Sequence, residues 1–123
     1  MLKIEFPKSQ LHPKAWGSEE WIKNFDKYCL KILNFNKGSR FSYHYHDLKT
    51  ETWLIDSGKI ILETKDLETS KDYEFVLEAG AIIHVPRLAP HRITALEETR
   101  IIEVSTQHFE NDSLKIGPGD SQK

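Results

Sequence analysis

Two histidines and a glutamate stand at a spacing that suits a metal ion. His44 and His46 are separated by one residue and Glu51 follows after four more, within residues 38–58, a stretch that begins and ends with glycine. Side chains at positions i and i+2 of a β-strand point to the same side, so both imidazoles can reach one ion. Imidazole nitrogen together with carboxylate oxygen suits zinc, iron, manganese or nickel, whereas calcium prefers oxygen ligands throughout. The spacing therefore predicts a site for one divalent metal ion.

The composition allows one domain around such a site. The chain has 123 residues, of which 38% are hydrophobic and 11% aromatic, which suffices for a single core. Cys29, the one cysteine, cannot form an internal disulfide and lies in the apolar run YCLKIL. We therefore expect a buried, unreactive thiol in a protein of a reducing compartment.

The charge balance excludes some classes of partner. The 17 basic and 19 acidic side chains give a formal net charge of -2 and are spread along the chain, without a basic patch for nucleic acid or for a membrane surface. The first residues contain no apolar segment of the length of an export signal, and no stretch approaches the roughly 20 apolar residues of a membrane span. We expect a soluble cytoplasmic protein that binds a small molecule.

Short strands separated by turn residues account for most of the chain. Alternating or continuous apolar patterns, bounded by glycine, proline and charged loops, predict strands at residues 2–6, 16–22, 27–35, 40–46, 50–56, 59–65, 73–77, 81–85, 90–95 and 100–106. Residues 8–14 are expected to form a loop, and Ser57 with Gly58 a tight hairpin. Such a pattern predicts an all-β protein, either an antiparallel sandwich or a small barrel.

Strand parity and the chain ends give three further expectations. Arg40 and Ser42 share one face of the expected strand 40–46 with His44 and His46, and ligands commonly bind where such inward side chains line the mouth of a barrel. Residues 1–110 are expected to form the domain, and residues 111–123 a C-terminal arm that is extended or partly disordered. The strand at residues 2–6 is a candidate for exchange between two subunits, so we expect a homodimer.

The motif residues resemble those of the cupins. Gly38, His44, His46, Glu51 and Gly58 match every fixed position of the first cupin motif, G-X5-H-X-H-X4-E-X6-G. In the second motif, G-X5-P-X-G-X2-H-X3-N, Gly80, Pro86 and His91 are in register, while Leu88 and Ala95 replace the glycine and the asparagine. The resemblance implies a jelly-roll barrel, the double-stranded β-helix of the cupins, and makes His91 the fourth metal ligand.

A narrower resemblance covers residues 13–120. The segments AWGSEEWI, GSRFSYHYHDLKTETWLIDSG, VPRLAPHRI and TRIIEVST are similar to the cupin domain of type II mannose-6-phosphate isomerases. Trp53 matches the tryptophan of that family and His91-Arg92 its H-R pair, but Lys49 replaces its arginine. The resemblance implies aldose-ketose isomerisation of a sugar or sugar phosphate, with zinc as the first choice of metal.

Candidate substrate and catalytic residues follow from residue type. We expect a substrate-binding group of Arg40, Ser42, Trp53 and Arg92, in which the tryptophan is an apolar wall and the arginines, together with Lys31 and Arg100, can clamp a phosphate. The proton must move between adjacent carbons, and the candidates for this role are Lys31, Lys49, His84 and Glu103, with Arg92 as a further catalytic candidate. His12, His84 and His108 lack ligand partners at a motif spacing, and we expect them not to bind the metal.

Two alternatives to an isomerase stay open. Three histidines and a glutamate also suit non-haem iron, so a dioxygenase or another small-molecule cupin enzyme fits the same ligands. A sugar-binding or sensor module that holds a metal without turnover fits the small size and the loss of the family's H-H-R-A segment. Metal content, oxygen consumption and conversion of a bound sugar distinguish the three.

Overall fold

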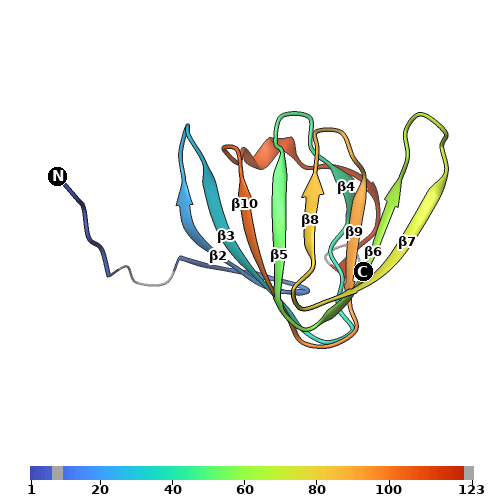
Figure 1. The fold of residues 1–123 in the computed structure, drawn as a ribbon, viewed down its shortest axis with the longest axis horizontal. Helices are drawn as coiled ribbons and strands as arrows, with labels where there is room; N and C mark the ends of the chain where they lie inside the picture. Colours follow the sequence, from blue (N-terminus) through green and yellow to red (C-terminus); the bar gives the residue numbers. More distant parts are fainter. Residues whose placement is uncertain (7–9, 121–123) are drawn as a thin grey trace.

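The computed structural model describes residues 1–6 and 10–120, whose regular secondary structure is β-strand apart from one 3₁₀ turn (Figure 1). The elements in chain order are β1 (Leu11–Lys14), β2 (Gly17–Asn24), β3 (Cys29–Phe35), β4 (Tyr43–Tyr45), β5 (Glu51–Ser57), β6 (Lys59–Lys65), β7 (Asp72–Glu78), β8 (Ile82–Val85), β9 (His91–Ala95), β10 (Thr99–Ser105), a 3₁₀ turn η1 (Glu110–Asp112) and β11 (Leu114–Gly117). The expected all-β class is confirmed.

The strands form two antiparallel sheets. One sheet has the order β1-β2-β3-β10-β5-β8 and the other the order β11-β4-β9-β6-β7. Neighbours within a sheet are often far apart in sequence, as where β10 lies between β3 and β5 and where β9 lies between β4 and β6. The two motif segments, around residues 44 and 91, therefore become adjacent through β4 and β9.

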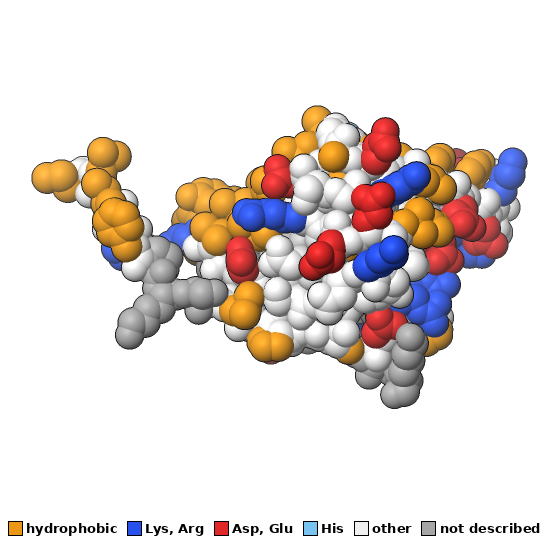
Figure 2. All heavy atoms as spheres, turned by 90° about the horizontal axis from the view of Figure 1, so that it is seen from below, with side chains coloured by type: hydrophobic (Ala, Val, Ile, Leu, Met, Phe, Trp, Pro, Cys, Tyr) orange, Lys and Arg blue, Asp and Glu red, His pale blue; other side chains and the backbone are white. Residues whose placement is uncertain are grey.

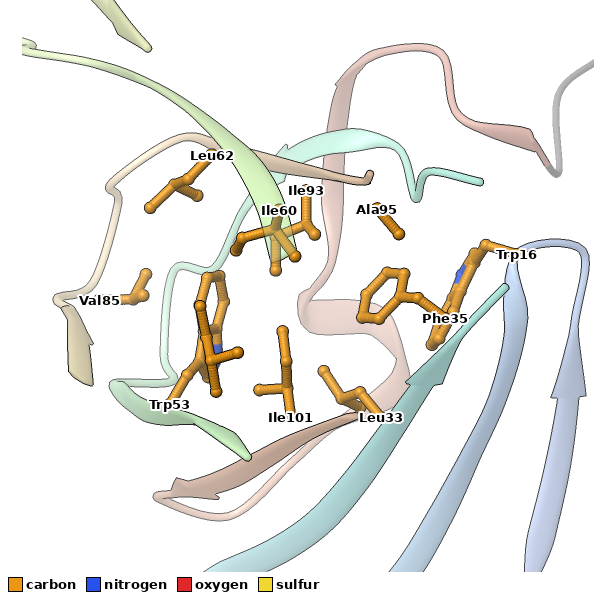
Figure 3. Close-up of a cluster of buried hydrophobic side chains, with 11 residues drawn as sticks. Trp16, Leu33, Phe35, Trp53, Ile60, Leu62, Val85, Ile93, Ala95 and Ile101 are labelled. Atoms are coloured by element: carbon orange, nitrogen blue, oxygen red, sulfur yellow. The ribbon is translucent and has the colours of Figure 1, made fainter. Parts of the chain in front are cut away.

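The interior has an apolar half and a polar half. In β3, β5 and β10 every second residue is buried, as expected for strands with one face on a core. The inward residues at one end of these strands are apolar and include Leu33, Trp53 and Ile101, which pack in the cluster of Figure 3. Further along, the same inward positions carry Lys31, Glu51 and Glu103. Parity thus places three charged side chains inside the barrel.

The hairpin between β5 and β6 depends on Gly58. This residue has φ of +98°, and a Cβ atom at that position would collide with the Thr99 hydroxyl and the Glu98 carbonyl. Glycine alone tolerates both the backbone conformation and the close approach. The hairpin expected from Ser57-Gly58 is therefore present, and it sets the start of β6.

The N-terminal expectations are wrong in two places. Residues 2–6 belong to no strand and are exposed, with Lys3 and Glu5 paired at 3.0 Å, and Figure 1 shows this segment extending away from the barrel. The expected loop instead contains β1, which pairs with β2; Pro13 fits there because β1 is an edge strand. Residues 7–9, where that loop was to begin, lie outside the described residues. The homodimer stays a prediction.

The C-terminal segment packs onto the barrel. β11 pairs with β4, and Asp112 of η1 is only 4% exposed. A strand at Leu114–Gly117 was not expected from the polar sequence after residue 107. Residues 121–123, included in the expected partly disordered arm, lie outside the described residues, and the division at residue 110 stays a prediction.

The surface carries mixed charge. Figure 2 shows lysine, arginine, aspartate and glutamate side chains interspersed on one face of the molecule. Among residues 1–6 and 10–120, no helix has the length and apolar character needed to cross a membrane.

Candidate metal centre

Three histidines converge inside the barrel. His44 of β4 lies directly opposite His91 of β9, and His46 follows one residue after the end of β4. All three are less than 10% exposed, and one ring nitrogen from each lies within 4.8 Å of the other two. These residues can hold a metal ion. The alternation of side chains in β4 and the antiparallel pairing with β9 are what bring them together.

Each imidazole is oriented by a backbone carbonyl. The Nδ1 atom of His44 lies 2.6 Å from the Ser42 oxygen, that of His46 lies 2.8 Å from the Asp112 oxygen, and that of His91 lies 2.9 Å from the Ala89 oxygen. A carbonyl oxygen only accepts hydrogen bonds, so Nδ1 must carry the proton. The Nε2 atom of each neutral ring then keeps its lone pair for a metal, as is usual for metal-binding histidines.

The three rings are held in the neutral form. Burial lowers the pKa of His44 to about 2 and that of His91 to about 3, and it also lowers the pKa of His46. The cause is the loss of hydration, which disfavours the cation more than the neutral ring. These histidines therefore do not need to lose a proton before a metal binds at neutral pH.

Glu51 supplies an oxygen that no hydrogen bond satisfies. Its Oε2 atom lies 3.8 Å from Nε2 of His46 and 3.6 Å from Nε2 of His91, and it is buried without a hydrogen-bond partner. An unpaired carboxylate oxygen in the interior is costly, and a cation beside it would remove that cost. This unpaired oxygen and the three Nε2 lone pairs fit a divalent metal ion. Glu51 as the fourth ligand stays our prediction.

A lysine and a second carboxyl adjoin Glu51. The Nζ atom of Lys49 lies 2.9 Å from Oε1 of Glu51 and 3.2 Å from Oε2 of Glu103. Burial would lower the pKa of Lys49, but these two carboxylates outweigh it and raise the pKa above its ordinary value. Burial, aided by the charge of Glu51, raises the pKa of Glu103 to about 7. Glu103 can therefore take and release a proton near neutral pH.

The centre opens into a cavity of about 390 Å³. Aromatic and aliphatic side chains form part of its wall, and charged side chains form the rest. The apolar lining residues are Trp16, Trp21, Leu33, Phe41 and Trp53. The charged ones are Lys14, Glu19, Lys31, Lys49, Glu51, Glu103 and Glu110, with Ser42, Ser113, His108 and the three central histidines completing the lining. A ligand in this cavity can contact the metal centre, the carboxyl groups of Glu51 and Glu103, and the apolar wall at the same time.

Several predicted site residues meet in this cavity. Lys31 is buried, pairs with Glu19 at 3.3 Å and lies over the Trp21 ring at 4.4 Å. Trp53 is 1% exposed, with its ring 5.2 Å from that of His91. Ser42 and Glu103 also line the cavity, together with the four predicted metal ligands.

The predicted arginines do not line the cavity, which corrects our expectation for them. Only Tyr43–Tyr45 is a strand, so the parity that linked Arg40 to the histidines fails; its backbone instead bridges to Thr94. Arg92 follows His91 on β9 and points to the other face, where it pairs with Glu63 at 2.9 Å. Arg100 is exposed and pairs with Asp56. None of these three guanidinium groups contributes to the cavity wall.

Two further histidines differ in their relation to the cavity, and that neither binds the metal stays a prediction. His108 lines the cavity with its Nδ1 atom 3.3 Å from Nζ of Lys49, although its position in the sequence gave no such signal. His84 is exposed and bonded to Thr52, outside the cavity, so it is no longer a candidate base. Sequence reasoning missed Asp112 as well, because its partners lie more than 60 residues away.

The family comparison agrees with this geometry. The model of the family "Mannose-6-phosphate isomerase C-terminal" matches residues 6–116. The chain belongs to this family. Among curated proteins, the chain is 24% identical over 115 residues to a mannose-1-phosphate guanylyltransferase of Sinorhizobium fredii (strain NBRC 101917 / NGR234), and the match covers 88% of the chain. It spans only 21% of that relative's length.

Solved structures identify the fold of the domain as a cupin jelly roll. An oxalate decarboxylase of Bacillus subtilis aligns with a TM-score of 0.80 at 16% identity, over 92% of this chain and 32% of the other. The capsular polysaccharide assembling protein CapF from Staphylococcus aureus aligns with a TM-score of 0.75 at 19% identity, over 92% of this chain and 33% of the other. The predicted cupin barrel is confirmed.

Replacement of a central histidine should abolish tight metal binding. His91→Gln keeps the approximate volume but removes the Nε2 lone pair, so we expect zinc affinity to fall by more than the roughly 100-fold that loss of a ligand's outer partner costs. Competition with a chromophoric chelator measures this. His84→Gln is the matched control, since His84 is exposed, and it should bind zinc as the unaltered protein does. Equal affinities for all three proteins would contradict the assignment.

Acid should destabilise the metal-free protein. In the unfolded chain the histidines protonate near pH 6.5, whereas burial keeps His44, His46, His91 and His108 neutral in the folded state to lower pH. Below pH 6.5 the unfolded chain binds more protons, so stability falls. Glu103, with its pKa raised from 4.5 to about 7, acts in the opposite direction, but four imidazoles outweigh one carboxyl. We expect the free energy of unfolding to drop by at least about 2 kcal/mol from pH 7 to pH 5.

Urea denaturation of chelator-treated protein at both pH values measures this drop. A free energy of unfolding that is constant or higher at pH 5 would show that the histidines are not held neutral.

Proposed function

We propose that this protein is a metal-dependent aldose-ketose isomerase, similar to mannose-6-phosphate isomerase, that acts on a small sugar or sugar phosphate. The observation that carries the proposal is the position of Glu103, a buried carboxyl that lines the same cavity as the metal-ligand group and lies 3.2 Å from Nζ of Lys49. Isomerisation needs both a polarised carbonyl and a group that moves one proton between neighbouring carbons. This cavity offers residues for each.

The ligand group is suited to a metal that acts as a Lewis acid. His44, His46, His91 and Glu51 would hold zinc, or alternatively manganese, iron or nickel, and the ion would polarise the carbonyl of an opened sugar. The Nδ1 bonds to backbone carbonyls keep the three rings in place. These residues orient the reacting end of the sugar towards the polar half of the cavity.

Glu103 is our choice for the proton-transfer group. Its carboxylate takes the proton from the carbon beside the carbonyl and returns it to the former carbonyl carbon, while the proton of the neighbouring hydroxyl moves to the former carbonyl oxygen. Lys49 donates a hydrogen bond to Oε2 of Glu103 at 3.2 Å, which fixes the carboxylate. Lys31 is paired with Glu19 and is suited to donate hydrogen bonds to sugar oxygens rather than to accept a proton. Arg92, also considered from sequence, lies outside the cavity and has no catalytic part here.

The apolar wall and the available cations limit how the sugar binds. Trp53 and Phe41 lie on the wall beside the histidines and exclude water from the reacting carbons. Of the lysines that line the cavity, Lys31 and Lys49 are ion-paired and Lys14 is exposed. A phosphate group would therefore lie at the Lys14 end, and the carbonyl end of the sugar at the histidines.

The substrate class is supported by the family and by one relative. The family description names mannose-6-phosphate isomerase, and the guanylyltransferase of Sinorhizobium fredii is named for mannose 1-phosphate. Because the chain spans 21% of that relative, the relative's activity as a whole is no guide to this domain. The likeness to the two solved structures supports the fold alone, at identities of 16% and 19%.

A binding module without turnover is the second candidate. Lys49 contacts both Glu51 and Glu103. The ion pair with Lys49 restrains Glu103, the group that would transfer the proton, and makes its carboxylate a weaker base. If that pairing persists with a sugar bound, the protein would hold a metal and a sugar without converting the sugar. The same experiment distinguishes the two candidates.

Exchange of one carbon-bound hydrogen tests the proposal. Zinc-loaded protein is incubated in D₂O with phosphorylated and unphosphorylated aldoses and ketoses, and NMR follows deuterium at the carbon beside the carbonyl. We expect deuterium incorporation together with aldose-ketose conversion. Glu103→Gln should slow the exchange by about 10²–10⁴-fold, the usual contribution of a general base, while zinc stays bound.

Glu63→Gln is the matched control, because Glu63 is an ion-paired glutamate outside the cavity. It should exchange deuterium at the unaltered rate. Sugar binding without any exchange would favour the binding module, and oxygen consumption by an iron-loaded form would favour the dioxygenase. Either result would overturn the isomerase.

A further inference from the structure

A buried aspartate outside the predicted ligand set holds the loop that lies between two of the predicted ligands. Asp112 belongs to η1 and is 4% exposed. Its Oδ1 atom accepts hydrogen bonds from the backbone nitrogens of Asp47 and Leu48, both at 3.0 Å, and its Oδ2 atom accepts one from that of Lys49 at 3.1 Å. One carboxylate thus fixes three successive amides.

Those amides lie between His46 and Glu51. The loop of residues 47–50 determines how the imidazole and the carboxylate at its two ends are placed relative to each other. The backbone oxygen of Asp112 also accepts the Nδ1 hydrogen of His46, at 2.8 Å. Asp112 therefore sets both the path of the loop and the direction of one ring.

The segment that carries Asp112 contacts the site at further points. We call residues 108–117 the C-terminal strap. The β11 part of the strap pairs with β4, where Lys115 is opposite His44, and β4 is only three residues long. At the other end of the strap, the backbone nitrogen of His108 donates to Asn24 Oδ1 at 2.8 Å. The strap thus lies along one side of the strand and loop that carry His44 and His46.

We propose that Asp112 is a positioning residue for the metal centre, and that docking of the C-terminal strap and metal binding are energetically coupled. The inference rests on the proposed function in one respect, namely that an ion binds at the three histidines. If the docked strap raises the affinity for the ion, a bound ion must stabilise the docked strap to the same extent. Neither the family motif nor the ligand spacing assigns any role to this residue.

A carboxylate is the side chain that this position requires. Two oxygens that only accept are needed for three amide donors, and ionised aspartate has both. Asparagine has one accepting oxygen and a donor NH₂ group, so it cannot accept hydrogen bonds from all three amides. Its NH₂ group would also face at least one backbone N–H, and two donors repel each other. Asp112→Asn therefore disturbs the loop with almost no change in volume.

The first test is zinc affinity. By chelator competition we expect Asp112→Asn to bind zinc roughly 10–100-fold more weakly than the unaltered protein, the usual loss when the partner of a ligand is removed. The matched control is Asp66→Asn, because Oδ1 of Asp66 likewise accepts two backbone amides, those of Glu68 and Thr69, in an exposed loop outside the cavity. The control should keep its zinc affinity within twofold.

The second test needs no substitution and remains informative if Asp112→Asn fails to fold. Hydrogen exchange of the unaltered protein is measured without metal and with saturating zinc. We expect zinc to slow exchange at the amides of residues 47–49 and of the strap by at least about tenfold, while those of Glu68 and Thr69 stay unchanged.

The outcomes distinguish a failure of the coupling from a failure of the proposed function. Unaltered zinc affinity of a folded Asp112→Asn, or unaltered exchange at the strap on zinc binding, would overturn the coupling and leave the proposed function intact. An unaltered protein that binds none of zinc, manganese, iron and nickel would overturn the proposed function and the coupling together.

Discussion

Three backbone carbonyls fix the imidazoles of His44, His46 and His91 with their protons on Nδ1 and their lone pairs inward. Burial keeps these rings neutral, because the interior disfavours the cation. Opposite them stands the Oε2 atom of Glu51, buried and without a hydrogen-bond partner. The three Nε2 lone pairs and this carboxylate oxygen all face the polar interior without a hydrogen donor. A divalent cation bound among them would supply the missing partner, and the rest of the site is arranged around that requirement.

The barrel meets this requirement by dividing its interior along the strands. The inward positions of β3, β5 and β10 are apolar at one end and become Lys31, Glu51 and Glu103 towards the other. The apolar half supplies the stabilising burial shown in Figure 3, while the charged half is held by ion pairs between buried groups. Such pairs add little net stability. Their retention inside a small core fits a role in binding and chemistry.

Local patterns in the sequence predicted much of the fold. Alternation in β3 and β10 and the turn at Gly58 depend on neighbouring residues, and these elements are present as expected. The apolar pattern of residues 2–6 did not produce a strand, and β1 and β11 arose in sequence that is polar or contains proline. β1 forms an edge hairpin with the neighbouring β2, whereas β11 pairs with β4, which is distant in sequence, so no local pattern indicates β11.

The site was predictable to the extent that its residues share a motif or a strand. The spacing of His44, His46 and Glu51, with His91 from the family resemblance, brought together residues that do converge in the structure. Arg40 was misplaced because β4 begins only at Tyr43, so the parity of the histidines does not extend to Arg40, which forms an isolated bridge to Thr94. Asp112 was not found because its role depends on contacts across more than 60 residues.

X-ray absorption spectroscopy of the zinc-loaded protein tests the central claim most directly, because it reads the atoms around the ion without reference to activity. The account predicts a first shell of nitrogen and oxygen atoms at about 2.0–2.2 Å, with outer scattering from three imidazole rings and none from sulfur. The outer imidazole scattering should drop to that of two rings in His91→Gln. A shell made of water and carboxylate oxygens, without imidazole scattering, would contradict it.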